Sequence, residues 1–321
     1  MPYLQAFTDT EKECAKRWLA AQVASMMGRK LEEGDWSRVY CRAKNIPDEG
    51  WSNLRIDINY QGLGLEMKLL RVPGLRGKPI KSVCGTTLMH PAATRSIRID
   101  DTSCNATDVM RDVFKQYAEL IQARTNRVKE AAPKKTPDMR TGWLIWEDNL
   151  TEFLYFEERL FPPNPEQFIA EWNATPAKGA RKASKSLWIY DKDTRQKRYS
   201  VTTSAGIKIQ PYFDVPPPSE KNLYYFRVQS EPVSATTVRL WVSATTARAL
   251  KSKLGSLDLA TVSTAILRAI EHVGKIVQAP EKEEGFAVAV DISREAHVQL
   301  LAAWEAVSDE HRAQLLLNAL A

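Results

Sequence analysis

Strict alternation of polar and apolar residues marks the segment 55–71, RIDINYQGLGLEMKLLR. Residues two apart lie on the same face of a β-strand, so Glu66 and Lys68 share a face in the second arm, while Asp57 lies on the polar face of the first. The connector QGLG carries two glycines, which suit a tight return between antiparallel arms. The pattern predicts a hairpin with one apolar face and one face that holds Asp57, Glu66 and Lys68.

Apolar residues at helical spacing predict helices at residues 8–27 and 105–132. Further helices are predicted at 164–175, where Asn164 is a possible cap, at 245–254 and at 257–277, and a helix pair at 294–320. The sequence predicts a turn-rich region over residues 28–50. Further β-strands are predicted over 79–100, 143–148, 152–161, 187–203 with a turn at Asp193 and Thr194, 205–221, 222–229, 236–244 and 285–293.

This order mixes helices and strands without regular βαβ alternation, which favours a mixed α+β fold over a doubly wound parallel sheet. A chain of 321 residues is long enough for two lobes. We expect the first lobe to span residues 1–175 and a basic second region, with a helical C-terminal part, to span 176–321.

Charge is distributed unevenly along the chain. The net charge is +6 and the pI about 9.0. Residues 178–198 contain eight basic and two acidic side chains, whereas residues 256–321 contain five basic and ten acidic ones, so residues 1–255 carry +11. A basic body of this kind indicates a polyanionic partner such as nucleic acid, although ordinary charge scatter in a soluble protein is the alternative.

Composition excludes several other classes. The four cysteines and four histidines lie far apart in the sequence, which speaks against a zinc knuckle or a Ser/His/Asp triad. No apolar run approaches the ~18 residues of a membrane span, and the N-terminus lacks the order of a secretion signal, so we expect a cytoplasmic protein without a membrane partner.

Asp57, Glu66 and Lys68 together suggest phosphodiester chemistry. Mg²⁺ prefers oxygen ligands and is typically held by one or two carboxylates plus substrate phosphate. Such an ion polarises a phosphoryl oxygen and lowers the pKa of bound water, and a nearby ammonium group offsets developing charge. The alternative is an exposed hairpin with a surface salt bridge, but the long apolar residues around Glu66 and Lys68 favour a central strand.

The spacing of Asp57, eight residues and then Glu66-Met67-Lys68 resembles the PD-(D/E)XK signature of restriction-endonuclease-like nucleases. The run GLEMKLLRVPGLRGKPIKSVCGTTLMHP is similar to the region that follows this signature in MutH-type nicking endonucleases and MvaI/BcnI-type restriction endonucleases. The resemblance covers residues 51–91, and Asp57 follows Arg55-Ile56 rather than a proline. It implies a central mixed sheet with helices on both faces, Asp57 and Glu66 as Mg²⁺ ligands with the Met67 main-chain carbonyl, and Lys68 as the catalytic lysine.

Two other segments are candidates for DNA contact. The segment TTLMHPAATRSIR offers hydroxyl and basic groups that could hold phosphates, or it is a surface strand with a tight turn. The basic hairpin at 185–199 could read base edges in a groove or neutralise backbone charge, and we favour the second for any given residue. The candidates are Thr86, Thr87, His90, Arg95, Arg98, Lys185, Lys192, Arg195, Lys197 and Arg198.

These features lead to the hypothesis of a Mg²⁺-dependent type II restriction endonuclease that cleaves double-stranded DNA to leave 5′-phosphates. A strand-nicking repair endonuclease of the MutH type and a DNA-binding protein without catalysis are the alternatives. A DNA methyltransferase is expected as a genetic neighbour of a restriction enzyme. The Leu/Ala-rich segment 294–321 would support a homodimer or fold back on the core.

Overall fold

A computed structural model describes residues 3–26, 31–47, 56–75, 97, 99–147, 150–177, 183–202, 208–211, 221–270 and 288–305. Contacts divide the chain into two compact units. The first comprises residues 1–6, 49–146 and 154–224, and the second comprises 7–48, 147–153 and 225–321. Residues 176–224 therefore group with the first unit rather than with the C-terminal region, which differs from the predicted division at residue 175.

The predicted hairpin is present. Strand β1 (Ile58–Tyr60) pairs antiparallel with β2 (Leu63–Val72), and Ile58 lies opposite Leu65. Gln61 and Gly62 have φ angles of 48° and 91°, which two-residue hairpin turns of this kind require. The turn is thus Gln61-Gly62, and the second glycine of the predicted connector, Gly64, belongs to β2.

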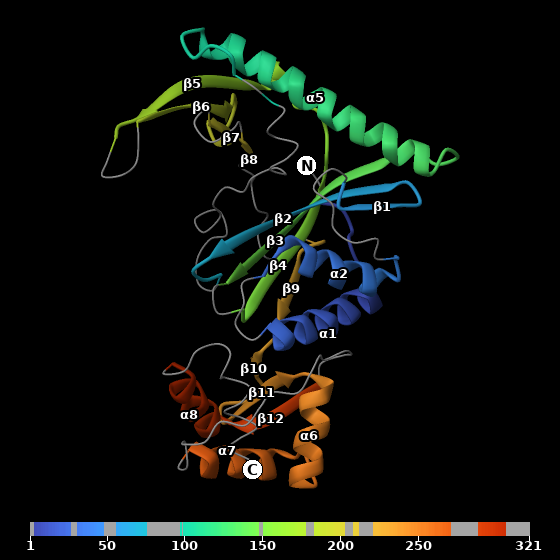
Figure 1. The fold of residues 1–321 in the computed structure, drawn as a ribbon, viewed down its shortest axis with the longest axis vertical. Helices are drawn as coiled ribbons and strands as arrows, with labels where there is room; N and C mark the ends of the chain where they lie inside the picture. Colours follow the sequence, from blue (N-terminus) through green and yellow to red (C-terminus); the bar gives the residue numbers. More distant parts are fainter. Residues whose placement is uncertain are drawn as a thin grey trace. The chain divides into compact units, whose positions relative to one another are not determined.

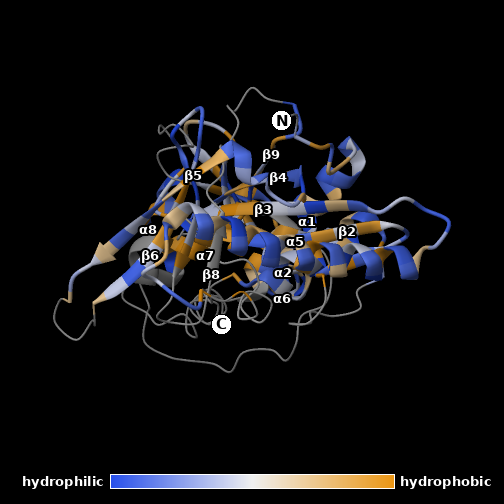
Figure 2. Ribbon diagram, turned by 90° about the horizontal axis from the view of Figure 1, so that it is seen from above, coloured by the Kyte–Doolittle hydropathy of each residue, from blue (hydrophilic) through white to orange (hydrophobic). Residues whose placement is uncertain are grey.

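Strand β2 lies inside a five-stranded sheet of order β1-β2-β3-β4-β9 (Figure 1). Strands β3 (Asp138–Glu147), β4 (Glu152–Arg159) and β9 (Tyr224–Arg227) confirm strands predicted from the sequence. Figure 2 shows hydrophobic colour along β2 and β3, as expected of strands covered on both faces.

Strands β2 and β3 run in the same direction. The Gly62 carbonyl accepts a hydrogen bond from Asp138 N, and Met139 fills the space beside Gly64. Further along, the Met67 sulfur fills the space beside Gly142. Residue numbers therefore rise in the same direction along both strands. Parallel neighbours need a long crossover connection, and here it includes the helix α5 (Ala106–Ala131). Helix α5 is the longest helix predicted from the sequence, and its N-cap is Asn105, whose side chain accepts a hydrogen bond from Thr107 N.

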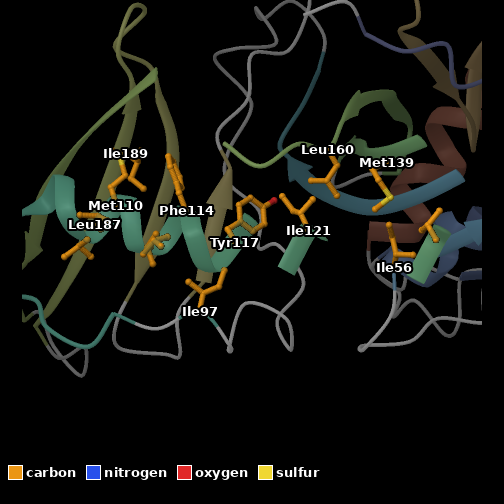
Figure 3. Packing of buried hydrophobic residues seen from close by; sticks show 14 residues of the cluster. Ile56, Ile97, Met110, Phe114, Tyr117, Ile121, Met139, Leu160, Leu187 and Ile189 are labelled. Carbon is orange, nitrogen blue, oxygen red and sulfur yellow. The ribbon is translucent and has the colours of Figure 1, made fainter. Parts of the chain in front are cut away.

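Helix α5 also covers a four-stranded antiparallel sheet in the same unit. This sheet has the order β5-β6-β7-β8, with β5 at Phe168–Thr175, β6 at Ser184–Asp191, β7 at Lys197–Thr202 and β8 at Lys208–Pro211. Figure 3 shows Leu187 and Ile189 of β6 beside Met110 and Phe114 of the helix, and all four side chains are buried.

The prediction of a helix at residues 164–175 in this unit is wrong. Residues 164–175 form only a short 3₁₀ turn, η1 (Pro165–Gln167), after the Asn164 cap, and continue as β5. The apolar residues Phe168, Ala170 and Trp172 pack on the core at strand spacing, and pairing with β6 supplies the backbone hydrogen bonds.

The second unit contains helices at both ends of its sequence. Helix α1 (Asp9–Met26) confirms the first predicted helix, whereas α2 (Glu33–Lys44) replaces the expected turn-rich region. A reciprocal capping arrangement of Glu32 and Asp35 starts α2, and buried Trp36, Val39 and Tyr40 form its apolar face.

The C-terminal part of this unit is a sheet of order β10-β11-β12 with three helices. Its strands are β10 (Ser230–Pro232), β11 (Thr237–Val242) and β12 (Val288–Ser293), and its helices are α6 (Ala244–Leu254), α7 (Leu259–Ile270) and α8 (Arg294–Glu305). Residues Val238, Leu240, Val262 and Ile292 lie in their shared core.

The described residues therefore form a mixed α/β protein with mixed sheets, as predicted from the order of elements. Within the same residues, no helix has the length and apolar character to cross a membrane. The predicted strands at 79–96 and the last part of the predicted terminal helix pair lie outside the described residues.

Candidate active site

The candidate active site is built on the β1–β2 pair. Because Ile58 lies opposite Leu65, one further step along the register places Asp57 opposite Glu66. Directly opposed residues of an antiparallel pair share a face, with Cβ atoms about 5 Å apart. Glu66 and Lys68 share one face of β2, as the sequence predicts, while Asp57 directly precedes β1 at the end of the paired segment.

Asp57 is fixed against the second strand. Its Oδ2 atom accepts a hydrogen bond from the Met67 backbone N–H at 2.6 Å. This contact holds the carboxylate beside Met67, the residue whose main-chain carbonyl is the third predicted metal ligand.

Glu66 and Lys68 form a buried ion pair. Lys68 Nζ lies 2.9 Å from Glu66 Oε1, and both side chains are 0% exposed. The alternative prediction of an exposed hairpin with a surface salt bridge is therefore wrong. Strand β2 is an inner strand, and covering both of its faces removes these two charges from water.

A second cation, from helix α5, also contacts Glu66. Arg124 donates from Nη1 to Glu66 Oε2 at 2.5 Å and is 6% exposed. Its spacing of seven residues from Tyr117 and four from Val128 places it on the buried stripe, and this spacing is a signal that the sequence carries.

Burying one carboxylate together with two cations carries a large desolvation cost. Removing a charge from water is costly, and pairing with hydrogen bonds offsets that cost only when the geometry is good. Each oxygen of Glu66 contacts a different cation, so the carboxylate is held in one orientation between β2 and α5.

Tyr117 of α5 lies close to this cluster. Burial raises the pKa of its hydroxyl well above the usual 10, and the negative charge of Glu66 raises it further, while Arg124 opposes that shift. Tyr117 therefore stays protonated and can only offer a neutral hydroxyl to this region.

The donor set fits a hard divalent cation in its chemistry. The Asp57 and Glu66 carboxylates and the Met67 carbonyl are oxygen ligands, and Mg²⁺ is commonly held by one or two carboxylates with water and phosphate completing the shell. No group of three His, Cys, Asp or Glu residues that could hold a metal lies within the described part of the chain. Each Glu66 oxygen contacts one cation and keeps a second lone pair, so a metal ion bound there would share the carboxylate with Lys68 and Arg124 or displace one of them.

The predicted DNA-binding residues separate into groups. Thr86, Thr87, His90, Arg95 and Arg98 lie outside the described residues. Lys192 and Arg195 are exposed in the β6–β7 turn, which Asp191 stabilises by accepting hydrogen bonds from Asp193 N and Thr194 N.

Two of the other basic residues of this hairpin have partners within the protein, and the third lines a cavity. Lys185 donates to the Thr102 carbonyl and lies over the Trp172 ring, and Lys197 lies 3.5 Å from the Trp188 ring centroid. Arg198 lines a cavity described below. Lys192 and Arg195 are therefore the members of this set best placed to contact a DNA backbone.

Searches against protein-family models, curated proteins and solved structures find no match to this chain.

Proposed function

We propose that this chain is a Mg²⁺-dependent endonuclease that cleaves double-stranded DNA at specific sites, as a type II restriction enzyme does. The observation that carries the proposal is the buried Glu66–Lys68 pair, with the Asp57 carboxylate bonded to the backbone N–H of Met67 between them. Burying two charged side chains on an inner strand costs free energy, which suggests a functional reason for keeping both. The net positive charge of the chain suits a polyanionic substrate.

Each residue of the cluster has a distinct task in this proposal. Asp57 and Glu66, with the Met67 carbonyl, would hold Mg²⁺, which supplies Lewis acidity toward a phosphodiester. Lys68 would place a positive charge where negative charge develops on the phosphate, because its ammonium group lies 2.9 Å from Glu66. Cleavage of the P–O3′ bond leaves the phosphate on the 5′ end.

Arg124 has two uses in this scheme. In the described structure it neutralises Glu66. When Glu66 binds a metal ion, the guanidinium becomes available to a phosphate, for which its planar fork is well suited.

The test is incubation of the purified chain with supercoiled plasmid in Mg²⁺ and, separately, in EDTA. A discrete fragment ladder that requires Mg²⁺ supports a restriction enzyme, while products that stop at open circles support a strand-nicking repair endonuclease. Lys68→Ala is expected to abolish either activity, and full activity of this variant contradicts the assigned site. A gene for a DNA methyltransferase beside this one would favour restriction, because the host DNA needs protection.

A specific observation favours a second candidate function. Both oxygens of Glu66 already contact cations, as expected if the cluster only stabilises the β2–α5 packing. The chain would then be a DNA-binding protein without catalysis. It would shift duplex DNA in a gel equally with Mg²⁺ and with EDTA, and would leave the DNA intact in both. Sedimentation of the free chain would separately test the predicted homodimer.

A further inference from the structure

A cavity of about 480 Å³ lies in the first unit, and no role has been assigned to it above. Its size falls within the ~300–1,000 Å³ range of small-molecule sites. Polar and aromatic side chains both line it, among them Tyr117, Trp143, Glu158, Phe161, Arg198 and Tyr199.

The cavity lies on the same face of the sheet as the candidate active site. Gly64 of β2 lies beside Met139 of β3. Two residues further along each of these parallel strands, Glu66 lies next to Thr141, and Thr141 lines the cavity. The Leu160 N–H bonds to the Met139 carbonyl across β3 and β4, and the same register places Thr141 opposite Glu158.

The electrostatic environment of Tyr117 agrees with this placement. Glu66 and Glu158 both act on the buried Tyr117 hydroxyl, which covers this face from α5. The backbones of Glu66 and Glu158 are separated by two strand spacings, about 10 Å. The cavity and the catalytic candidates are therefore neighbours on one continuous surface.

A carboxyl group and a guanidinium group define the polar side of the cavity. Glu158 Oε1 accepts a hydrogen bond from the Trp143 indole N–H at 3.0 Å, which fixes the orientation of the carboxyl group. Arg198 is close enough to Glu158 to favour its charged form. One wall of the cavity thus offers an acceptor, the Glu158 carboxyl group, beside the several N–H donors of the Arg198 guanidinium group.

Aromatic rings form other parts of the lining. Phe161 is 48% exposed although it is a large apolar side chain, and it lines the cavity together with the rings of Tyr199 and Phe168. Exposed aromatic rings of this kind can stack on the flat face of a nucleobase, whatever the base.

We infer that this cavity binds one nucleobase of the cytosine or guanine type. Both bases carry an amino group and a carbonyl group on either side of a ring nitrogen, so the amino group can donate to Glu158 while the carbonyl accepts from Arg198. Adenine lacks the carbonyl and thymine lacks the amino group. Carboxylates that accept from the cytosine amino group and guanidiniums that donate to the guanine carbonyl are common in base recognition.

The protonation state of Glu158 separates the two bases. Burial raises the pKa of Glu158 above 4.5, and the Trp143 N–H and the charge of Arg198 oppose this shift. A protonated carboxyl group can donate to the unprotonated ring nitrogen of cytosine, whereas a carboxylate suits the ring N–H of guanine. The inference concerns binding alone and holds whether or not the chain cleaves DNA.

The experiment is a calorimetric titration of the full chain with dCMP, dGMP, dAMP and dTMP in EDTA. We expect dCMP or dGMP to bind at least tenfold more tightly than dAMP and dTMP. Equal affinity for all four nucleotides, or no binding of any, overturns the inference.

Two variants locate the bound base. Phe161→Ala should weaken binding about tenfold, and because this ring is half-exposed its removal leaves the fold intact; Tyr225→Ala, at another exposed ring outside the cavity, is the matched control. Glu158→Met should remove the preference for dCMP and dGMP. Binding that survives Phe161→Ala unchanged overturns the inference.

A second arm identifies the source of the base. If the cavity receives a base from a DNA strand, single-stranded oligo(dC) or a mixed strand containing guanine binds more tightly than the mononucleotide, with the same dependence on Phe161. If it binds a free nucleotide, the mononucleotide binds as tightly or more so. Because neither arm requires cleavage, failure of the nuclease proposal leaves this result interpretable.

Discussion

At the residue scale, Glu66 is the centre of the site because both Lys68 and Arg124 contact its carboxylate. Its two partners come from different parts of the chain: Lys68 is two residues away on the same strand, and Arg124 is 58 residues away on α5. The strand period therefore reveals the first contact in the sequence, while the second depends on how the helix packs on the sheet.

Replacing Arg124 by Met should destabilise the protein by about 3 kcal/mol, because a buried carboxylate loses one of its two cations. Urea unfolding followed by circular dichroism measures this change in the free energy of unfolding. Arg127→Met, at an exposed position of the same helix, is the matched control and should change it by no more than about 0.5 kcal/mol. Equal effects of the two substitutions would show that the Arg124–Glu66 contact contributes nothing.

Glu158 gives a pH dependence with a definite sign. Its pKa is raised by burial in the folded state, so the folded protein holds the proton to higher pH than the unfolded chain does. The free energy of unfolding therefore falls as the pH rises above about 4.5, until the folded-state pKa is passed.

Glu158→Gln removes this titration while leaving an acceptor for Trp143. The variant should have nearly the stability of the unsubstituted protein at pH 4 and exceed it at pH 7, as measured by urea unfolding at both values. A variant that loses stability relative to the parent as the pH rises would contradict the assigned shift.

At the element scale, local signals decide which elements the sequence predicts. Helix α5 and the β1–β2 hairpin are predicted correctly because each carries a clear period and its own cap or turn. Helix α2 was missed because Gly34 and the charged residues around it resemble a turn, although Trp36 and Tyr40 give it an apolar face. Strand β5 was mistaken for a helix because the Asn164-Pro165 start is typical of one, while its strand form depends on pairing with β6. The candidate site is predicted in part for the same reason. The sequence indicates Asp57, Glu66 and Lys68 because they belong to one hairpin, but it does not indicate Arg124 or the cavity, which depend on how the helix packs on the sheet.

Close packing on the other face of the sheet gives an element-scale prediction. A Cβ atom at Gly142 would lie 2.4 Å from the Tyr155 hydroxyl and 3.1 Å from the Met67 sulfur, so Gly142→Ala should cost about 1–3 kcal/mol of stability. Adding Tyr155→Phe removes the hydroxyl that obstructs the methyl group. In a double-mutant cycle the pair should therefore cost less than the sum of the single substitutions, and strict additivity would contradict the packing described here.

At the scale of the whole molecule, the charge distribution and the exposed β6–β7 turn bear on the proposed partner. If Lys192 and Arg195 each contact a DNA phosphate, the double variant Lys192→Gln/Arg195→Gln should reduce the slope of log K against log salt by about 2. Filter binding over a range of salt concentrations measures the slope. The control pair Lys251→Gln/Lys253→Gln removes the same charge from exposed positions of α6 and should leave the slope nearly unchanged. Equal reductions in the two pairs would mean that binding responds only to net charge.

The most direct test of the proposed active site compares two equally buried carboxylates of one sheet. Glu66 and Glu157 are both 0% exposed, but Glu157 contacts Tyr155 and Arg140, and strand alternation places it on the face opposite the candidate site. The measurement is the initial rate of Mg²⁺-dependent plasmid cleavage by Glu66→Gln and Glu157→Gln, after circular dichroism has shown that both fold. We predict that Glu66→Gln lowers the rate by about a hundredfold or more, while Glu157→Gln cleaves at nearly the parent rate. Cleavage by Glu66→Gln at the parent rate, or an equal loss in both variants, would contradict the assignment of Glu66 as a metal ligand of a DNA endonuclease.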